Sequence, residues 1–531
     1  MTDPNTKDLL DMNNYSIEKL PKMDKSRVEK IMAKIGIPLA ILAFVAIYCF
    51  STISFLETLD PTSLASGALK RFDAIGHEQF VRINYAMLAI FVAAIILWIT
   101  EAIPNYLTSL LLILAIVLTQ VTTDKVAYAQ LGHPVMWLNI LSFVLASMLV
   151  KTRAAKRFAL WFVIRFGKNS FWVIFSFIVI NVVLSAFISA TTAKATILLP
   201  IFMVIAAIYG ATGGENRNNF GRNLVMQNLF QINIGASGFL TGSGANLLAA
   251  SLIAGAMGWE LFSYQDWFIA AFPLAIILIL IAWFVGSKLI FPLKKGENRP
   301  QIEGGLDKLK VEYKAMGKMT IAEYKAIAIF LGVLLLWATD KQHGINQTAV
   351  AFMGAVVALF PGIGVVKWND VDIPWHLMLF SAGAYTLGAG LDATGLPNTL
   401  VDVVFNFFAI DQNTPFWVLY FVLTALMLFS ALIFQSKTMR ALIFVPIAIG
   451  VAQKFGYSVL SLSFPVALLI EHVYVLPFNS KPAALLYTTN QYSWSDTFKF
   501  GFAMMCISWV MIIIWGETVL KWLGYTNGLF F

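Results

Sequence analysis

The sequence predicts an all-α polytopic membrane protein. Of its 531 residues, 59% are hydrophobic and only 12% are charged, which is too apolar a composition for a soluble multidomain protein. The apolar runs are about 20 residues long and do not alternate with polar residues, so the predicted spans are helices and not the strands of a barrel. Two further apolar runs are about twice that length, which predicts segments that fold back on themselves.

About 11 apolar runs are predicted to be transmembrane helices. They cover residues 35–56, 83–100, 105–122, 135–150, 225–255, 266–292, 321–338, 346–366, 373–391, 457–488 and 499–520. The two longer runs, 170–209 and 415–452, would each extend roughly 60 Å as a continuous helix, about twice the bilayer core. Each is therefore either a re-entrant hairpin with its tip inside the membrane or a pair of spans joined by a surface loop.

Basic residues cluster in the N-terminal tail up to Lys34, in residues 151–168 and in residues 288–318. The positive-inside rule places these segments, and with them the N-terminus, on the cytoplasmic side of a cell membrane, either plasma or inner. The same rule accounts for the net charge of +8, so no nucleic-acid partner is expected. Residues 154–168 mix basic and aromatic side chains, as expected for a helix that lies at the membrane surface.

The two halves of the chain resemble one another. Leu-Trp-Ile-Thr-Glu at 97–101 returns as Leu-Trp-Ala-Thr-Asp at 336–340, and Ser189 is matched by Ser436. Matches in the same order at similar offsets indicate an internal duplication. Duplicated halves with interrupted apolar segments are typical of secondary transporters built from inverted repeats, whose site lies where the repeats meet.

Two polar clusters at the middle of the long runs bring positive charge into apolar surroundings. Ionisable groups are costly at such depth, so they are usually functional, and cationic ones predict an anion site. The clusters read Ser-Ala-Thr-Thr-Ala-Lys from Ser189 and Ser-Lys-Thr-Met-Arg from Ser436. The candidate binding residues are Ser189, Thr191, Thr192, Lys194, Ser436, Lys437, Thr438 and Arg440.

Two further clusters predict helices that are broken within the membrane. Glycines in the first and prolines in the second interrupt helical hydrogen bonding and free backbone groups, which membranes tolerate only where they line a cavity. Alternatively, the first cluster is a small-residue packing face, and Lys481 is a loop lysine that reaches water. The candidates are Gly242, Ser243, Gly244 and Asn246 in the first half and Asn479, Ser480, Lys481 and Pro482 in the second.

These four clusters resemble the divalent-anion:sodium symporter (DASS) family of dicarboxylate, tricarboxylate and sulfate carriers, over residues 80–525. Members carry Ser-Asn-Thr at each hairpin tip and a Gly-Thr-Pro-Pro-Asn-like motif in each broken helix. The resemblance implies a homodimer in which a transport domain moves as an elevator against a scaffold, with arms near 154–168 and 394–409. The implied parts are a cytoplasmic tail (1–34), scaffold (35–168 and 321–410), transport domain (169–292 and 411–531) and cytoplasmic linker (293–320).

The chain departs from the family where sodium would bind. Ala190 and Lys437 stand in place of the hairpin asparagines, and Lys481 has entered the second broken helix. A sodium site needs converging oxygen ligands, and an ammonium group repels a cation, so both sodium sites are predicted to be lost. No cofactor or metal is expected. Lys194, Lys437, Arg440 and Lys481 would instead balance the charge of an organic dianion.

Permanent cations predict obligate exchange. Moving an uncompensated charge through the membrane costs about 3 kcal/mol, which slows the return of an empty carrier roughly 100-fold. Candidate substrates are succinate, malate, 2-oxoglutarate, tartrate, citrate and sulfate. A symporter that keeps a sodium or proton site at residues 242–246 stays open. A receptor or an intramembrane enzyme is more remote, since no catalytic motif is present.

Two further ionisable residues, Glu471 and His376, lie outside these clusters. Glu471, which His472 follows, is expected either to pair with a site lysine or carry a proton, or to be a helix residue near the cytoplasmic surface or part of a structural ion pair. His376 follows Pro374 and Trp375, and this position predicts an anchor at the membrane interface.

Overall fold

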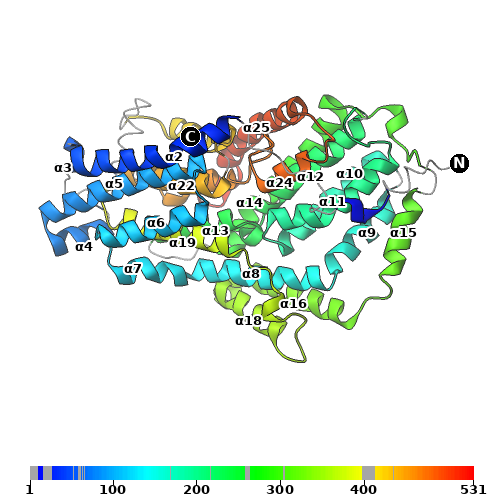
Figure 1. Cartoon of the computed structure of the whole chain (residues 1–531), viewed down its shortest axis with the longest axis horizontal. Helices are drawn as coiled ribbons and strands as arrows, with labels where there is room; N and C mark the ends of the chain where they lie inside the picture. Colours follow the sequence, from blue (N-terminus) through cyan, green and yellow to red (C-terminus); the bar gives the residue numbers. More distant parts are fainter. Residues whose placement is uncertain are drawn as a thin grey trace.

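The computed structural model describes residues 10–15, 27–51, 53–57, 61, 64, 66–167, 169–215, 217–257, 263–302, 305–396, 413–434 and 436–530. The regular structure of these residues is helical, which confirms the predicted fold class (Figure 1). Seven of the described helices are long and apolar enough to cross a membrane, and further apolar helices of 10–17 residues accompany them. The shorter helices include hairpin arms and pieces of broken helices.

Two helical bundles form the part of the chain that the sequence assigns to the scaffold. In the first bundle α2 packs along α5, and α6 packs along α19, so that elements from both halves of the chain lie side by side. In the second bundle α8 packs against α16 and α18. The bounds are α2 (Arg27–Val45), α5 (His77–Thr100), α6 (Asn105–Leu118), α19 (Trp375–Asp392), α8 (Pro134–Lys151), α16 (Ile321–Ala338) and α18 (Gln347–Leu359).

Each long apolar run folds back at its polar cluster. Helices α10 (Ser170–Phe187) and α11 (Thr191–Ile208) form the first hairpin. Helix α21 (Phe416–Phe429) and the short η10 (Ser430–Leu432) lead to α22 (Lys437–Lys454) in the second. The depth of the hairpin tips in the membrane stays a prediction.

Both predicted spans that contain a helix-breaking cluster are divided into two helices. The span at 225–255 consists of α12 (Asn219–Ser237) and α13 (Gly244–Ala256). The span at 457–488 consists of α23 (Val459–Leu468) and α24 (Lys481–Tyr487). Ser243 and Ser480 stand just before the second helix of each pair in extended backbone, and each serine oxygen caps that helix by accepting a backbone N–H.

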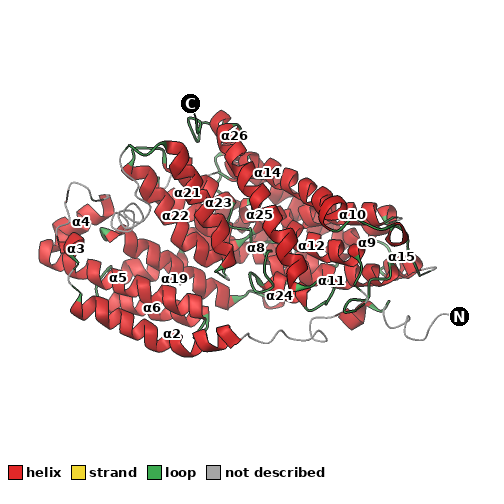
Figure 2. Cartoon of the chain, turned by 90° about the horizontal axis from the view of Figure 1, so that it is seen from above, coloured by secondary structure: helices red, strands yellow, loops and turns green. Residues whose placement is uncertain are grey.

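The halves interlock around these breaks. Helix α13 of the first half packs on α22 and α23 of the second, while α24 of the second half packs on α11 and α12 of the first. Figure 2 shows α24 beside α11 and α12, and α22 beside α23. Each hairpin is therefore supported by a helix from the opposite half, which brings all four polar clusters together.

The remaining helices connect and surround these groups. Helix α9 (Ala154–Phe166), at the predicted surface position, packs on α10 and α15 (Gly305–Ala315), and its Arg157 forms a buried ion pair of 2.5 Å with Glu323 of α16. Most of the second predicted arm, 394–409, lies outside the described residues, as does most of the predicted tail, 1–34. The domain boundaries and the side of the N-terminus stay predictions.

Shorter elements and the last long helices complete the chain. They are η1 (Met12–Tyr15), η3 (Ala46–Phe50), α3 (Ser54–Glu57), α4 (Ser66–Ile75), α7 (Asp124–Ala129), η5 (Gln130–Gly132), η6 (Leu240–Gly242), α14 (Tyr264–Phe284), η7 (Val285–Ile290), η8 (Lys295–Glu297), α17 (Asp340–His343), η9 (Trp368–Asp370), α25 (Trp494–Glu517) and α26 (Val519–Trp522).

Candidate functional site

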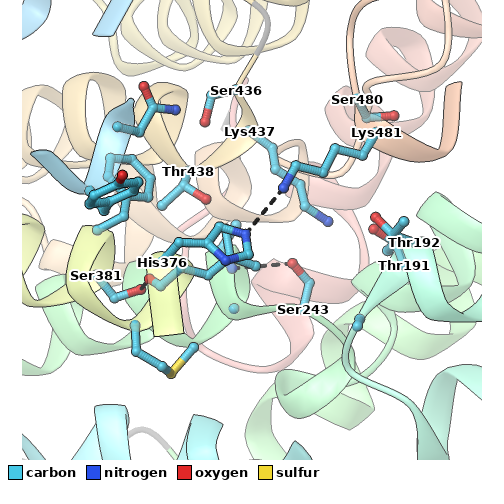
Figure 3. Close-up of a pocket in the computed structure, with 18 of the residues that line it drawn as sticks. Thr191, Thr192, Ser243, His376, Ser381, Ser436, Lys437, Thr438, Ser480 and Lys481 are labelled. Carbon is cyan, nitrogen blue, oxygen red and sulfur yellow. Dashed lines mark hydrogen bonds between the residues drawn. The ribbon is translucent and has the colours of Figure 1, made fainter. Parts of the chain in front are cut away.

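The four polar clusters meet at one cavity of about 840 Å³. Its wall on the side of the hairpins and broken helices includes most of the candidate residues, several of which are labelled in Figure 3. They are Ser189, Thr191, Thr192, Ser243, Gly244, Ser436, Lys437, Thr438, Asn479, Ser480, Lys481 and Pro482. Gly242, Lys194, Asn246 and Arg440 do not belong to this wall.

The wall is built largely from the starts of helices. Helices α11, α13 and α22, together with the short α24, all begin at the cavity, so their N-terminal backbone N–H groups are directed toward it. Such ends carry a partial positive charge and bind anions. Ser189, at the tip of the first hairpin, is 6% exposed, and its Oγ has no hydrogen-bond partner among the described residues. It is free to donate to a ligand.

Lys437 and Lys481 bring full positive charges to the cavity. Lys437 forms an ion pair with Glu471, with 2.7 Å between Nζ and Oε2. Of the two expectations for Glu471, the pair with a site lysine is therefore the one that the structure shows. Lys481 is exposed, and its Nζ lies 3.3 Å from Nε2 of His376 across the cavity (Figure 3). Both lysines lie at the first position of their helices, α22 and α24, where the chain leaves the turn.

Lys194 does not line the cavity, contrary to the expectation from the sequence. Its side chain is fully buried, and its Nζ donates to Ser185 Oγ at 2.8 Å and to the backbone oxygen of Ile232 at 3.2 Å. Lys194 is one turn inside α11, on the side that meets α10 and α12. It therefore joins the two arms of the first hairpin to the first broken helix.

Arg440 is likewise directed away from the cavity. Its fully buried guanidinium donates to Ser430 Oγ at 2.9 Å and to the backbone oxygens of Ile470 and His472 at 3.2 and 3.4 Å. It also donates to the backbone oxygen of Met427. Ile470 and His472 lie in the unwound segment after α23, where carbonyl groups have no helical partner, so Arg440 satisfies them.

Three other candidate residues stabilise the backbone around the helix breaks and do not offer their side chains to the cavity. Asn246 is fully buried and donates from Nδ2 to the backbone oxygens of Ala236 and Phe239, both 3.0 Å away, which satisfies the break after α12. Asn479 lines the cavity, but its side chain is hydrogen-bonded to the backbone. Its Oδ1 accepts from the N–H of Leu476, and its Nδ2 donates to the carbonyl oxygen of Ala431. Gly242 lies against the backbone of Ala236, where a Cβ would meet the carbonyl oxygen at 2.3 Å.

Comparison with known proteins identifies the family. Residues 79–526 match the model of the sodium:sulfate symporter transmembrane region. The chain belongs to the divalent-anion:sodium symporter family. A "Membrane protein" of Cupriavidus necator is 24% identical over 460 residues, covering 83% of this chain and 88% of the relative.

Two relatives carry the name sodium-dependent dicarboxylate transporter SdcS. The one from Staphylococcus saprophyticus is 26% identical over 457 residues, covering 81% of this chain and 86% of the relative. The one from Staphylococcus aureus is 25% identical over 438 residues, covering 78% of this chain and 82% of the relative. The solved structure of the YdaH transporter of Alcanivorax borkumensis is 12% identical to this chain, with a TM-score of 0.43. The match covers 74% of this chain and 85% of the YdaH chain.

Family membership makes this chain a multi-pass membrane transporter of the symporter family and not an enzyme, as the sequence predicted. The receptor and enzyme alternatives are thereby set aside. In this family member the cavity is the natural candidate for the transport site, because it lies where the two halves of the duplicated chain meet.

The opposite wall of the cavity contains residues that the sequence did not single out. They are contributed by the turn between α5 and α6 and by α6, α8 and α19 of the scaffold group, and include Glu101, Asn105, Asn139, His376 and Ser381. His376 faces the cavity from the first turn of α19, and its predicted place at the membrane interface stays a prediction. The polar sequence Glu-Ala-Ile-Pro-Asn at 101–105, between two apolar spans, was the one available signal for this wall.

Proposed function

We propose that this transporter exchanges small organic dianions, C4 to C6 dicarboxylates such as succinate, malate or 2-oxoglutarate, across the cell membrane without sodium. The observation that carries the proposal is the meeting of Lys437 and Lys481 with the N-termini of α11, α13 and α22 at one cavity. In this proposal Ser189, Thr191, Ser436 and Thr438 donate hydrogen bonds to the carboxylates, and the lysines balance their charge.

The dicarboxylate class is supported by the relatives and by the size of the site. Relatives named for dicarboxylate transport match about four fifths of the chain. A cavity of about 840 Å³ falls in the usual range of small-molecule sites and leaves room for a four- to six-carbon anion with its waters.

Independence from sodium is supported by the positions of the basic side chains. Arg440 already donates to carbonyl oxygens of the unwound segment between α23 and α24, and Lys194 donates to the backbone oxygen of Ile232 within α12. Carbonyl oxygens freed by unwound helices are the ligands that a sodium ion would use in a transporter. With Arg440 bonded to such oxygens in the second half and Lys194 buried beside the first broken helix, an added cation meets repulsion.

Obligate exchange of one anion for another follows because the charges of the basic side chains are permanent. An empty site that keeps Lys481 unpaired must carry a charge through the membrane, at about 3 kcal/mol, and this slows its return roughly 100-fold. A bound dianion removes that cost. We further propose that the hairpins and broken helices move as an elevator against the scaffold group of a homodimer, with the contact between Lys481 and His376 broken and remade in each cycle.

Counterflow in proteoliposomes tests the proposal. Vesicles loaded with unlabelled succinate should accumulate labelled succinate equally in sodium and in choline buffers, and empty vesicles should take up none. The competing candidate is a sodium- or proton-coupled symporter, which the names of the relatives favour. Accumulation in empty vesicles driven by a sodium or proton gradient would establish that candidate and overturn ours.

A further inference from the structure

A carboxylate lies directly behind the anion cavity, where it opposes anion binding. Glu471 belongs to the unwound segment between α23 and α24 and pairs with Lys437 at the second hairpin tip. Its side chain is fully buried, whereas that of Lys437 is 19% exposed. Glu471 Oε2 accepts from Lys437, and Oε1 has no hydrogen-bond partner in the part of the chain that the structure describes. An unpartnered oxygen of a buried carboxylate leaves the ion pair incompletely satisfied.

Arg440 borders Glu471 on the other side. Its guanidinium donates to the backbone oxygens of Ile470 and His472, the two neighbours of Glu471 in the chain. Glu471 thus lies between a cation that is bonded to the backbone and a cation that faces the cavity. Of the two cations beside Glu471, only Lys437 can contact a ligand, because Arg440 is fully buried and bonded to several acceptors.

The charge at the site is therefore smaller than the two cavity lysines suggest. Lys437, Lys481 and Glu471 together carry a net charge of about +1, and the N-termini of α11, α13 and α22 each add about half a charge. These charges add up to about +2.5. Glu101 on the scaffold wall lowers the sum to about +1.5, which is nearer to the charge of a dianion than to that of a trianion.

We infer that Glu471 determines how many negative charges the transported anion carries. By neutralising Lys437 it matches the cavity to dicarboxylates and disfavours tricarboxylates, so it is a specificity-determining residue that acts through Lys437. This inference rests on the proposed function, since it concerns selection among carboxylates at that site. Loss of the Glu471 charge leaves a second full cation at the hairpin tip, and an anion with one more carboxylate then binds better.

The test compares three unlabelled anions as competitors of labelled succinate in counterflow: butyrate, succinate and propane-1,2,3-tricarboxylate, at a pH where every carboxyl group is ionised. The readout is the ratio of the inhibition constants of succinate and the tricarboxylate. Glu471→Gln is isosteric and should raise this ratio at least about tenfold, since one unit charge changes close to the ligand. The double variant K437Q/E471Q removes both charges and should return to within about threefold of the wild-type ratio.

Two results would overturn the inference: an unchanged ratio in E471Q, or an equal shift in E471Q and in the double variant. If E471Q does not fold, Lys437→Gln gives the opposite test, because it leaves Glu471 unpaired and should lower the ratio about tenfold. An unchanged ratio there also overturns it. Wild-type vesicles that fail to exchange succinate would instead refute the proposed function, so the two failures are distinguishable.

Discussion

Replacing Lys481 by methionine tests the proposed site at its most exposed charge. Lys481 lies at the first position of α24, faces the cavity, and forms no ion pair with any described carboxylate. Its one described polar contact is the approach to His376, 3.3 Å away. Methionine keeps most of the length of the side chain and removes only the charge, so the change should leave the fold intact.

The expected loss of affinity follows from the geometry. Two opposite charges about 4 Å apart attract by about 4 kcal/mol at the effective dielectric constant of a protein surface, and exposure of Lys481 reduces this further. We expect a net loss of about 2 to 3 kcal/mol, which raises the Kd for succinate about 30- to 150-fold. Lys481→Arg keeps the charge and should lose less than about tenfold.

The assay is titration of the purified protein with succinate, followed by tryptophan fluorescence or calorimetry. Lys499→Met is the matched control, because Lys499 is an exposed lysine of α25 that does not line the cavity. The control should bind like the wild type. A Kd for K481M within about threefold of wild type would refute the electrostatic role of Lys481 and weaken the exchange proposal with it.

Three further predictions concern the framework and the coupling ion. Arg440→Met should destabilise the protein by about 3 to 5 kcal/mol, because buried carbonyl groups lose their donor, and an unchanged thermal transition in detergent would contradict this. Asn246→Ala should cost about 2 kcal/mol by the same measurement, whereas a stabilised variant would show that the bonds to Ala236 and Phe239 are unimportant. Replacing sodium by choline should shift the wild-type transition by less than about 1 °C, and a larger stabilisation by sodium would reveal a bound cation.

The sequence was sufficient for the positions of the turns. Uncharged apolar runs interrupted by Ser189 and Ser436, and by the glycines and prolines after Thr241 and Pro477, coincide with the observed hairpin tips and helix breaks. Local chemistry determines these features, because serine caps a helix start and glycine or proline interrupts one. The role of Glu471 was left open between a pair with a site lysine and a structural one, and the structure pairs it with Lys437.

The direction of the side chains could not be read from the motifs. Lys194 and Arg440 lie in the same clusters as Thr191 and Lys437, yet they are directed into the protein. Their direction depends on which helix packs on which face of α11 and α22, and this is set by the interlocking of the two halves. The scaffold wall with His376 was missed for the same reason, since it comes from helices far away in the sequence.

The two buried cations also bear on how the duplicated halves work. Lys194 is the fourth residue of α11, and Arg440 is the fourth residue of α22. Lys194 joins Ser185 of its hairpin to a backbone oxygen of the first broken helix, and Arg440 makes the corresponding contacts in the second half.

This equivalence separates two tasks within each hairpin. The first helical positions, Thr191 and Lys437, face the cavity, and the cations one turn later join the hairpin to backbone oxygens of the neighbouring broken helix. A buried cation that is bonded to backbone oxygens cannot also bind the ligand. The framework should therefore stay rigid while the charged side chains in the cavity exchange one partner for another. Substitutions at the fourth positions should therefore lower stability in both halves, and substitutions at the first positions should change binding.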